Sequence, residues 1–565
     1  MKKHTQYFRT AFLAAASILL FAVATSPAAE DNALEDLLLM QGRYPRAFFF
    51  RASAGMASRG NVSYERWEKS FSRLMGIEGK ALWEELENRE RGRVLERFTR
   101  FKKENPRQLV MLHYNGNARD PRYERDEFYA GHWIYYNGAT IREDIPAEDG
   151  QTTIKVSNAS LFRMNVGRYG EADEDVGLCM LGPDGEPDWS RCEQVHLLDV
   201  NRRNNTITVE RGMYGTEPRA FPAGESYAAA HCSEGPWGRN NNLMWFYNYS
   251  TVCPEDSEGQ QCTDIMLDEL ERLFSSRGKL AAFDGLEFDV LFNHPHGGGG
   301  RGPDCDADGK ADRGYVDGKN TYGVGVIEFL RALRERVGEE KVILADGHGE
   351  RHQRGFNILN GIESEGWPDL IDTNVRDWSG GLNRHFFWDE NSYEPVFNYV
   401  NHKFIQPGAT GGARYRPEVP FKIHRLVMAA AVFTNSAICY SYSPRSERDE
   451  LYGIWDELRM GREKRIGWLG RPEGPAVSMA SGSADVLEGA GSPPGQTLLE
   501  RCKGEDTALS LDDGRLRLKG KGDAEKIKLA MDGVPTKGQD LYVTVTARAA
   551  GRKGYPQEMA RLMHM

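Results

Sequence analysis

Positive charge is scarce in this sequence relative to negative charge. Lysine and arginine number 72 against 83 aspartates and glutamates, which gives a formal net charge of −11 at pH 7. Domains that bind nucleic acid concentrate positive charge on one face, where it neutralises phosphates. The acidic balance of this chain therefore argues against a nucleic-acid partner.

The sequence also lacks a long apolar run beyond its first residues. Lys2 and Lys3 precede an apolar segment, residues 11–24, and Ser26-Pro27-Ala28 follows it as a small-residue cleavage site. A basic start, a short apolar core and small residues are the marks of a secretory signal peptide, and the core is too short to span a bilayer. We therefore expect residues 1–29 to be a signal peptide, the mature protein to be secreted or periplasmic, and no segment to span the membrane.

The eight cysteines show no Cys-x-x-Cys spacing and no Cys/His cluster, so a zinc site is not expected. Export permits disulfides, and the close pairs Cys179/Cys192 and Cys253/Cys262 are candidates for disulfides that each close a short loop. The glycine run 297–300 is not followed by Lys-Ser/Thr at a helix start, so it is not a phosphate-binding loop. No organic cofactor is therefore expected.

Between residues 46 and 444, short apolar runs alternate with amphipathic helical stretches such as the face formed by Val94, Leu95, Phe98 and Phe101. This alternation is typical of parallel strands joined by crossover helices. The length and the number of units favour a (β/α)8 TIM barrel of the α/β class over residues 30–480, although a doubly wound open sheet would alternate similarly. The predicted strands are Ala47–Ala52, Leu109–Tyr114, Leu243–Tyr249, Leu286–Phe292, Val342–Ala345, Asn357–Glu365, Val396–Phe404 and Ala437–Tyr442.

Two regions depart from a plain barrel. Residues 128–236 carry β segments such as Thr152–Val156 and Thr206–Glu210 and no convincing helix, which predicts a β-rich insertion after the second strand. Residues 481–496 are a linker rich in glycine, serine and proline. Residues 497–565 predict a small β-sandwich-like module with a hairpin over 509–518, which we expect to be incomplete and which is a candidate carbohydrate-binding unit.

Two acidic residues alternate with apolar residues in the segment Phe283–Val290. Alternate side chains share one face of a strand, so Glu287 and Asp289 point the same way, opposite to Leu286 and Phe288. Carboxylates that project from a core strand are costly to bury and rarely serve packing. Neighbouring carboxylates also push their pKa values apart, which provides a protonated and an ionised form at one pH.

Candidates for a second carboxyl group end two other predicted strands. Glu363 and Glu365 share a face before Trp367, and Asp346 follows the fifth strand. The carboxyl ends of barrel strands form the active-site face, so all three are expected near Asp289. Further polar and aromatic residues near strand ends are candidates for substrate binding: Tyr114, Trp245, His348, Trp367, Asn401 and His402.

A regular acidic pattern follows the predicted fourth strand. Asp304, Asp306, Asp308 and Asp312 occupy positions 1, 3, 5 and 9 of a loop that has glycine at position 6. This spacing matches a calcium-binding loop, in which oxygen ligands surround a hard cation and glycine permits the turn. Position 12 is Tyr315 rather than an acidic residue, so Asp317 or another chain segment would complete the shell. We expect a structural calcium ion here, and the alternative is a solvated acidic loop.

The motif Asp284-Gly285-Leu286-Glu287-Phe288-Asp289 resembles the fourth-strand motif of the α-amylase and α-galactosidase superfamily of glycosidase barrels. In that motif a strand led by glycine ends in an aspartate nucleophile, and Asp289 matches its position. The α-amylase pattern has an arginine where this chain has Glu287. Asn401-His402 resembles the Asn-His-Asp motif of the seventh strand, but Lys403 replaces the essential aspartate, so that role is not carried over.

Residues 46–475 are also similar to secreted bacterial barrels described as hypothetical glycosyl hydrolases. The segments Trp455-Asp456-Glu457 and Gly467–Pro472 resemble the part that follows the barrel in those proteins. In the α-galactosidase branch the acid/base residue lies on the sixth strand, where Glu363 and Glu365 are predicted.

The resemblance implies a glycoside hydrolase that acts on a polysaccharide or oligosaccharide. Asp289 would be the nucleophile or base, Glu365 or Glu363 the acid, with Asp346 as the rival acid, and Glu287 would tune a pKa or bind a sugar hydroxyl. Carboxyl groups lie about 5 Å apart in retaining enzymes and further apart in inverting ones, and either outcome is open. Two alternatives remain: a polysaccharide lyase, which uses a tyrosine or histidine base, and a non-catalytic carbohydrate-binding barrel.

Overall fold

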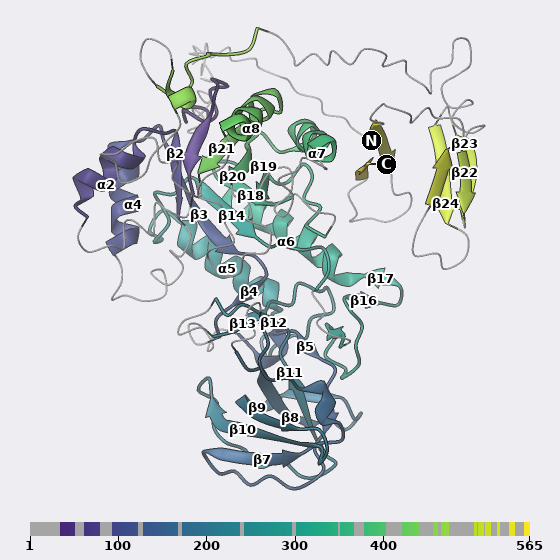
Figure 1. The fold of residues 1–565 in the computed structure, drawn as a ribbon. Helices are drawn as coiled ribbons and strands as arrows, with labels where there is room; N and C mark the ends of the chain where they lie inside the picture. Colours follow the sequence, from purple (N-terminus) through teal and green to yellow (C-terminus); the bar gives the residue numbers. More distant parts are fainter. Residues whose placement is uncertain are drawn as a thin grey trace, which may run out of the picture.

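The chain forms a barrel, an inserted sheet and a group of C-terminal strands (Figure 1). The predicted signal peptide 1–29 and the linker 481–496 lie outside the described residues. Among the helices that are described, none is long and apolar enough to cross a membrane. The computed structural model describes residues 34–50, 62–79, 93–121, 128–167, 172–237, 242–295, 301–347, 351–365, 378–402, 421–440, 456–460 and 465–473, and the backbone of strands between 502 and 564.

Eight parallel strands close into a barrel, which confirms the predicted α/β barrel of the TIM type and excludes the open sheet. The last strand pairs with the first, with Cys439 opposite Phe48. In barrel order the strands are β1 (Ala47–Phe49), β2 (Gly76–Gly79), β3 (Leu109–Asn115), β14 (Gly285–Asp289), β18 (Val342–Asp346), β19 (Gly361–Glu365), β20 (Asn398–His402) and β21 (Ser436–Tyr440).

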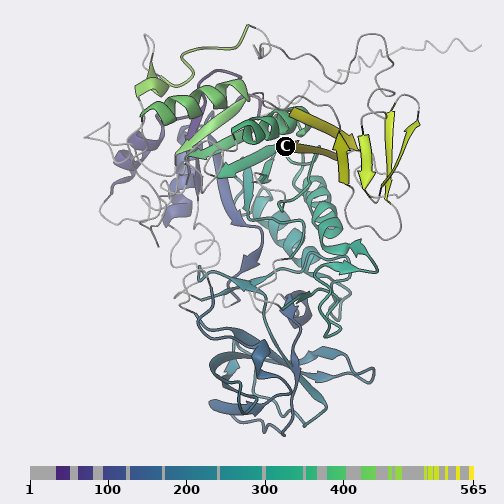
Figure 2. The same ribbon diagram turned by 45° about the vertical axis from the view of Figure 1, so that its right-hand side comes forward.

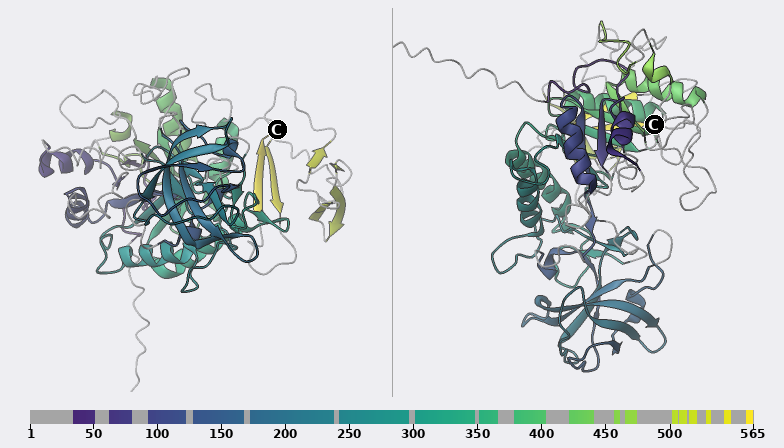
Figure 3. Two further views of the ribbon diagram at one scale, coloured as in Figure 1. Left: turned by 90° about the horizontal axis from the view of Figure 1, so that it is seen from below. Right: turned by 90° about the vertical axis from the view of Figure 1, so that its left-hand side faces the viewer.

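Amphipathic helices surround the barrel (Figures 1 and 3). They include α2 (Tyr64–Phe71), α4 (Arg93–Glu104), α5 (Cys262–Phe274), α6 (Thr321–Val337), α7 (Trp378–Asn391) and α8 (Phe421–Phe433). Of the predicted helical face, α4 buries Val94, Phe98 and Phe101, whereas Leu95 is partly buried. Trp67 of α2 packs on Phe98 with ring centroids 5.6 Å apart, so these two helices share one core.

The predicted third strand, Leu243–Tyr249, is not part of the barrel. Its central residues form β13 (Met244–Phe246), which pairs antiparallel with β4 (Ala118–Arg119) and β12 (Ser233–Glu234). The prediction was wrong because the apolar residues of this run serve another core. Its aromatic side chains pack on Trp133, where the inserted sheet joins the barrel.

The barrel strand that the sequence did not reveal is β2. Only Ile77 is apolar in its Gly-Ile-Glu-Gly segment, so there is no hydrophobic run from which a strand is predicted. Gly76 permits close pairing with β3, since a Cβ atom there would lie 2.6 Å from the carbonyl oxygen of Leu109. With β2 in the barrel, the inserted β segments follow the third barrel strand rather than the second.

The inserted region contains a six-stranded antiparallel sheet. Its strands, in sheet order, are β6 (Ala139–Thr140), β11 (Ser226–Ala230), β8 (Asp175–Leu181), β9 (Pro187–Asn201), β10 (Thr206–Met213) and β7 (Gln151–Lys155). Strands β7 and β10 include most of the β segments predicted from the sequence, and Ile154 lies opposite Ile207. A buried ion pair with an N–O distance of 2.6 Å joins Arg211 of β10 to Glu193 of β9.

The inserted sheet lies beyond the carboxyl end of β3, and the chain passes from β3 through β4 before it enters that sheet (Figures 1 and 2). The segment after β14 returns to the inserted region, where β15 (Pro303–Asp304) pairs with β5 (Tyr135–Tyr136). The hydroxyl of Tyr227 also donates to the carbonyl oxygen of Gly309 at 3.2 Å. The loop after the fourth barrel strand is thus tied to the inserted region at two points.

The C-terminal strands pair as three antiparallel ladders. The predicted hairpin is β23 (Thr507–Asp512) with β24 (Arg515–Gly520), in which Leu509 lies opposite Leu518. The other ladders join β22 (Cys502–Glu505) to β25 (Lys528–Met531) and β26 (Tyr542–Ala547) to β27 (Met559–His564).

The cysteines that were candidates for loop-closing disulfides are free thiols in this structure. Cys179 of β8 lies directly opposite Cys192 of β9. Cys262 begins α5, and Cys253 lies in the segment before it. The predicted disulfides are therefore not formed here.

Candidate active site

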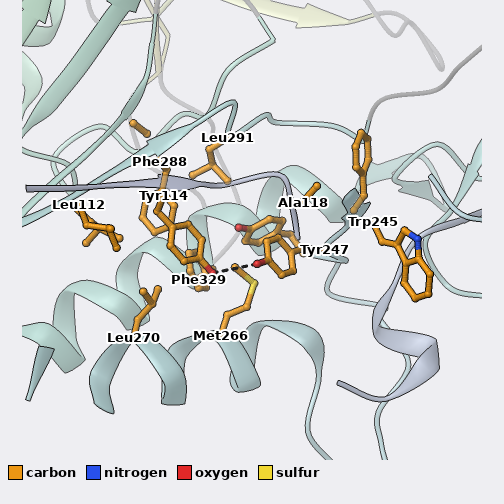
Figure 4. Close-up of a cluster of buried hydrophobic side chains, with 14 of the residues drawn as sticks. Leu112, Tyr114, Ala118, Trp245, Tyr247, Met266, Leu270, Phe288, Leu291 and Phe329 are labelled. Carbon is orange, nitrogen blue, oxygen red and sulfur yellow. Dashed lines mark hydrogen bonds between the residues drawn. The ribbon is translucent and has the colours of Figure 1, made fainter. Parts of the chain in front are cut away.

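Strand β14 directs alternate side chains to opposite sides of the barrel wall. Leu286 and Phe288 are fully buried on the outer side, where Phe288 contacts Phe329 of α6 with ring centroids 5.8 Å apart (Figure 4). Glu287 and Asp289 have the opposite phase and face the barrel interior. They lie opposite residues 113 and 115 of β3 in the strand register.

Glu287 lies in the barrel interior with no exposed surface. Neither of its carboxylate oxygens has a hydrogen-bond partner among the described residues, and Nε2 of His113 lies 3.3 Å from Oε2. Burial raises the pKa of Glu287 well above its ordinary value, and the carboxylates of Glu363 and Glu78 raise it further. A carboxyl group in this environment is stable only when a proton or a cation neutralises it.

Asp289 lies two residues further along β14, at the rim of the barrel. Its side chain is 22% exposed, and its Oδ2 atom lies 3.4 Å from the same Nε2 of His113. The next residue, Val290, has a φ of 56°, in the left-handed region that β-branched residues rarely adopt. The backbone N–H of Val290 donates to Oδ2 of Asp346 at 2.9 Å. This hydrogen bond holds the turn at which the chain leaves the strand.

Glu363 and Glu365 lie on β19 at different depths. Glu363 is 2% exposed, and its Oε1 atom accepts a hydrogen bond from Nδ2 of Asn401 at 2.6 Å. Glu365 ends the strand opposite Asn401 and is half-buried. Asp346, the rival acid on β18, is 2% exposed. Of the three candidates for the second carboxyl group, Glu365 is the least buried.

The interior also contains three groups that were not among the predicted site residues: Glu78, His113 and Tyr399. Glu78 of β2 is fully buried, and one of its oxygens lies within 4.8 Å of ligand atoms of His113 and Glu287. The hydroxyl of Tyr399 on β20 is buried with no hydrogen-bond partner among the described residues. The pKa of Tyr399 is raised well above its ordinary value by burial and then by Glu287 and Glu363.

Tyr114, predicted to bind substrate, does not face the barrel interior. It is 2% exposed, and its hydroxyl lies 3.2 Å from that of Tyr247 in the core between β3 and α5 (Figure 4). Its neighbour His113 has the opposite phase on the strand and points inward. The prediction was wrong by one residue, and one residue on a strand reverses the face.

Trp245, also predicted to bind substrate, is a core residue where the inserted sheet meets the barrel. It is 1% exposed, stacks on His231 with ring centroids 3.5 Å apart, and donates its indole N–H to Asp175 at 2.8 Å. Neither face of the ring is open to a sugar, so this prediction was wrong. His348, Trp367 and the side chain of His402 lie outside the described residues.

The acidic loop after the fourth barrel strand forms a separate cluster. One carboxylate oxygen from each of Asp304, Asp306 and Asp308 lies within 4.8 Å of the others. Asp304 is 4% exposed; its Oδ2 atom accepts the backbone N–H of Gly309, and its Oδ1 atom has no hydrogen-bond partner among the described residues. Burial raises the pKa of Asp304 to about 9.

Asp312, the fourth predicted calcium ligand, is not part of this triad of carboxylates. Its oxygens accept backbone N–H groups from Cys305, Asp306 and Gly314. These hydrogen bonds tie the end of the loop to its beginning. In this structure Asp312 therefore shapes the loop around the three aspartates.

No family model and no curated protein matches this chain.

Proposed function

We propose that this protein is a glycoside hydrolase that cleaves a polysaccharide or oligosaccharide at the rim of the barrel. The observation that carries the proposal is the difference in depth among the interior carboxylates. Asp289 and Glu365 have exposed surface at the carboxyl ends of the fourth and sixth strands, whereas Glu287, Asp346 and Glu363 do not. Catalytic residues of barrel enzymes occupy such strand ends.

The two rim carboxylates supply the pair that glycosidic bond cleavage needs. Asp289 acts as the nucleophile in a retaining reaction, or as the base that activates water in an inverting one, and Glu365 protonates the leaving oxygen. His113 lies within 3.4 Å of Asp289 and orients it. Asp346 holds the Val290 turn and thereby the position of Asp289.

The experiment that tests this function is a screen of the purified protein on a panel of polysaccharides for new reducing ends. Release of reducing ends by the wild-type protein, and its loss in Asp289→Asn and in Glu365→Gln, supports the proposal. Products that absorb in the ultraviolet would identify a lyase instead. Retention of a polysaccharide without new reducing ends would identify a binding barrel.

We also propose that the loop Asp304–Asp312 binds a structural calcium ion. Three carboxylates converge there, and the buried Oδ1 atom of Asp304 lacks a hydrogen-bond partner among the described residues. A hard cation would neutralise this group and satisfy the oxygen. We further propose that the protein acts outside the cytoplasm, because its basic start and short apolar N-terminal segment predict a signal peptide.

A further inference from the structure

Three carboxylates meet in the barrel interior below the proposed catalytic pair. They belong to Glu287, Asp346 and Glu363, on the consecutive barrel strands β14, β18 and β19. One oxygen of each lies within 4.8 Å of the others, and the residues are 0%, 2% and 2% exposed. The strand register produces this convergence, because Asp346 lies directly opposite Glu363 and two residues beyond Leu344, the residue opposite Glu287, so that all three side chains have the same phase.

Two of these carboxylates are held in place by hydrogen bonds from neighbouring strands and turns. Asp346 accepts the backbone N–H of Val290, and Glu363 accepts the side-chain amide of Asn401. Metal-binding carboxylates are commonly oriented by hydrogen bonds of this kind, which fix the direction of the carboxyl group toward the ion.

Glu287 differs from the other two carboxylates. It is fully buried, and both of its oxygens lack a hydrogen-bond partner among the described residues. The buried hydroxyl of Tyr399, the residue opposite Glu363 in the strand register, also has none. Buried polar atoms are normally paired, so these atoms indicate that the site has a further occupant.

We propose that Glu287, Asp346 and Glu363 bind one divalent cation of the oxygen-preferring class, such as Mg²⁺, Ca²⁺ or Mn²⁺. A hard cation suits a set of carboxylate ligands without a thiolate. It offsets the repulsion among three buried negative charges. It also fixes the end of β18, and so the Asp346 contact that holds the Val290 turn next to Asp289. This site goes beyond the proposed function and is separate from the loop Asp304–Asp312.

The rival explanation is that shared protons, without a metal, neutralise the cluster. The two explanations differ in a measurement that does not depend on hydrolysis. Mn²⁺ is the probe, because free Mn²⁺ gives an electron paramagnetic resonance signal that decreases on binding. The protein is first stripped with chelator and carries Asp306→Ala and Asp308→Ala, so that the loop does not contribute.

The expected result in this background is one saturable Mn²⁺ site per chain. Glu287→Gln and Glu363→Gln, which keep shape and remove charge, should each weaken Mn²⁺ binding by roughly tenfold or more. Glu78→Gln is the matched control, because it removes a buried carboxylate that neighbours Glu287 but lies outside the triad, and it should weaken Mn²⁺ binding less than either triad variant does. Circular dichroism checks that each variant is folded.

Asp289→Asn separates this proposal from the proposed function, since it should abolish hydrolysis and keep Mn²⁺ binding. Absence of saturable binding, or unchanged binding in both Glu287→Gln and Glu363→Gln, would overturn the cation site and leave the hydrolase proposal intact. Loss of binding in Glu78→Gln with retention in Glu363→Gln would also overturn the assignment, because the ion would then belong to Glu78, His113 and Glu287. If either triad variant fails to fold, the other decides.

Discussion

The position of Asp289, the proposed nucleophile or base, depends on residues that need not touch a substrate. Holding a β-branched residue in the left-handed region costs about 1–3 kcal/mol, so the Val290 turn needs an external restraint. Asp346 provides this restraint from a position that is 2% exposed, where water does not compete for the hydrogen bond. We therefore assign Asp346 a positioning role rather than the role of acid that its place at a strand end suggested.

Replacement of Asp289 by asparagine tests the central assignment at this scale. The amide keeps the shape of the side chain and removes the negative charge, so the reaction loses its nucleophile or base. We expect turnover to fall by roughly a thousandfold or more, with an unchanged melting temperature because the residue lies at the rim. Turnover on the identified substrate is the measurement. A variant that keeps more than about a tenth of the wild-type rate would contradict the assignment.

Replacement of Glu365 by glutamine tests the role of general acid. A general acid matters most for poor leaving groups, so natural substrates should lose turnover strongly while activated aryl glycosides are largely spared in bond cleavage. Azide should rescue turnover if the enzyme is retaining. The measurement is kcat across a series of leaving groups.

The matched control for that series is Glu363→Gln, two residues earlier on the same strand face but buried. It should show no dependence on the leaving group, and Asp346→Asn should lower kcat for all substrates alike with little change in KM. If kcat depends on the leaving group in Asp346→Asn and does not depend on it in Glu365→Gln, the general acid lies on the fifth strand.

The sequence identified part of this site because two carboxylates in an apolar strand break a visible pattern. Glu287 and Asp289 were found in this way, and the alternation of β14 settles their direction. On β3 the same logic should have selected His113, which shares a face with Asn115, instead of Tyr114. Glu78 had no such signal, since it stands in a segment with one apolar residue, and only the closure of the barrel brings it to the cluster.

At the scale of elements, a pattern of apolar residues predicts a barrel strand only where the side chains of that strand themselves form part of the barrel core. Strand β2 is buried because its neighbours cover it and because its glycines allow the adjacent strand to approach closely. Its sequence has only one apolar residue and therefore resembles that of a loop. The segment Leu243–Tyr249 has the opposite character, because its apolar side chains serve the junction with the inserted sheet. The helices were easier to predict, since a face such as Val94, Phe98 and Phe101 repeats at helical spacing.

Gly285, at the start of β14, offers a test of how tightly the barrel strands pack. A Cβ atom there would lie 1.9 Å from the carbonyl oxygen of Val342 on the neighbouring strand. Because backbone must move to make room, we expect Gly285→Ala to lower the free energy of unfolding by about 3 kcal/mol. Urea unfolding measures the change.

The control for that substitution is Gly42→Ala, before β1. Gly42 has a φ of 62°, but beyond its chain neighbours nothing lies within 4 Å of the position that a Cβ atom would take, so only the backbone conformation opposes the change. We expect this variant to lose about 1 kcal/mol. Equal losses in the two variants would show that steric contact in the barrel is not what requires Gly285.

At the scale of the whole molecule, the acidic loop connects the barrel to the inserted region. It begins after the fourth barrel strand, which carries Asp289, and is tied to the inserted region by the pairing of β15 with β5 and by the Tyr227 hydroxyl. A cation bound in this loop would therefore stabilise the junction between the two parts as well as the loop itself. Its effect should appear in the melting of the whole protein.

Removal of the proposed calcium should lower the melting temperature, and added calcium should restore it, because an ion that binds only the native state stabilises it by mass action. The effect should depend on pH. Without the ion, the pKa of Asp304 is raised to about 9 in the folded protein from its ordinary value near 4, so the folded state binds a proton that the unfolded state has released. Stability of the chelated protein should therefore fall as pH rises from about 4 to about 9.

Calcium replaces that proton, so the calcium-induced rise in melting temperature should be larger at pH 8 than at pH 5. Differential scanning fluorimetry at both pH values, with the metal content measured after chelation, checks this expectation. Asp306→Ala combined with Asp308→Ala removes two of the three converging carboxylates and should abolish the response to calcium. A melting temperature that stays the same in verified metal-free and calcium-loaded protein at both pH values would rule out calcium as the ion that joins the barrel to the inserted sheet.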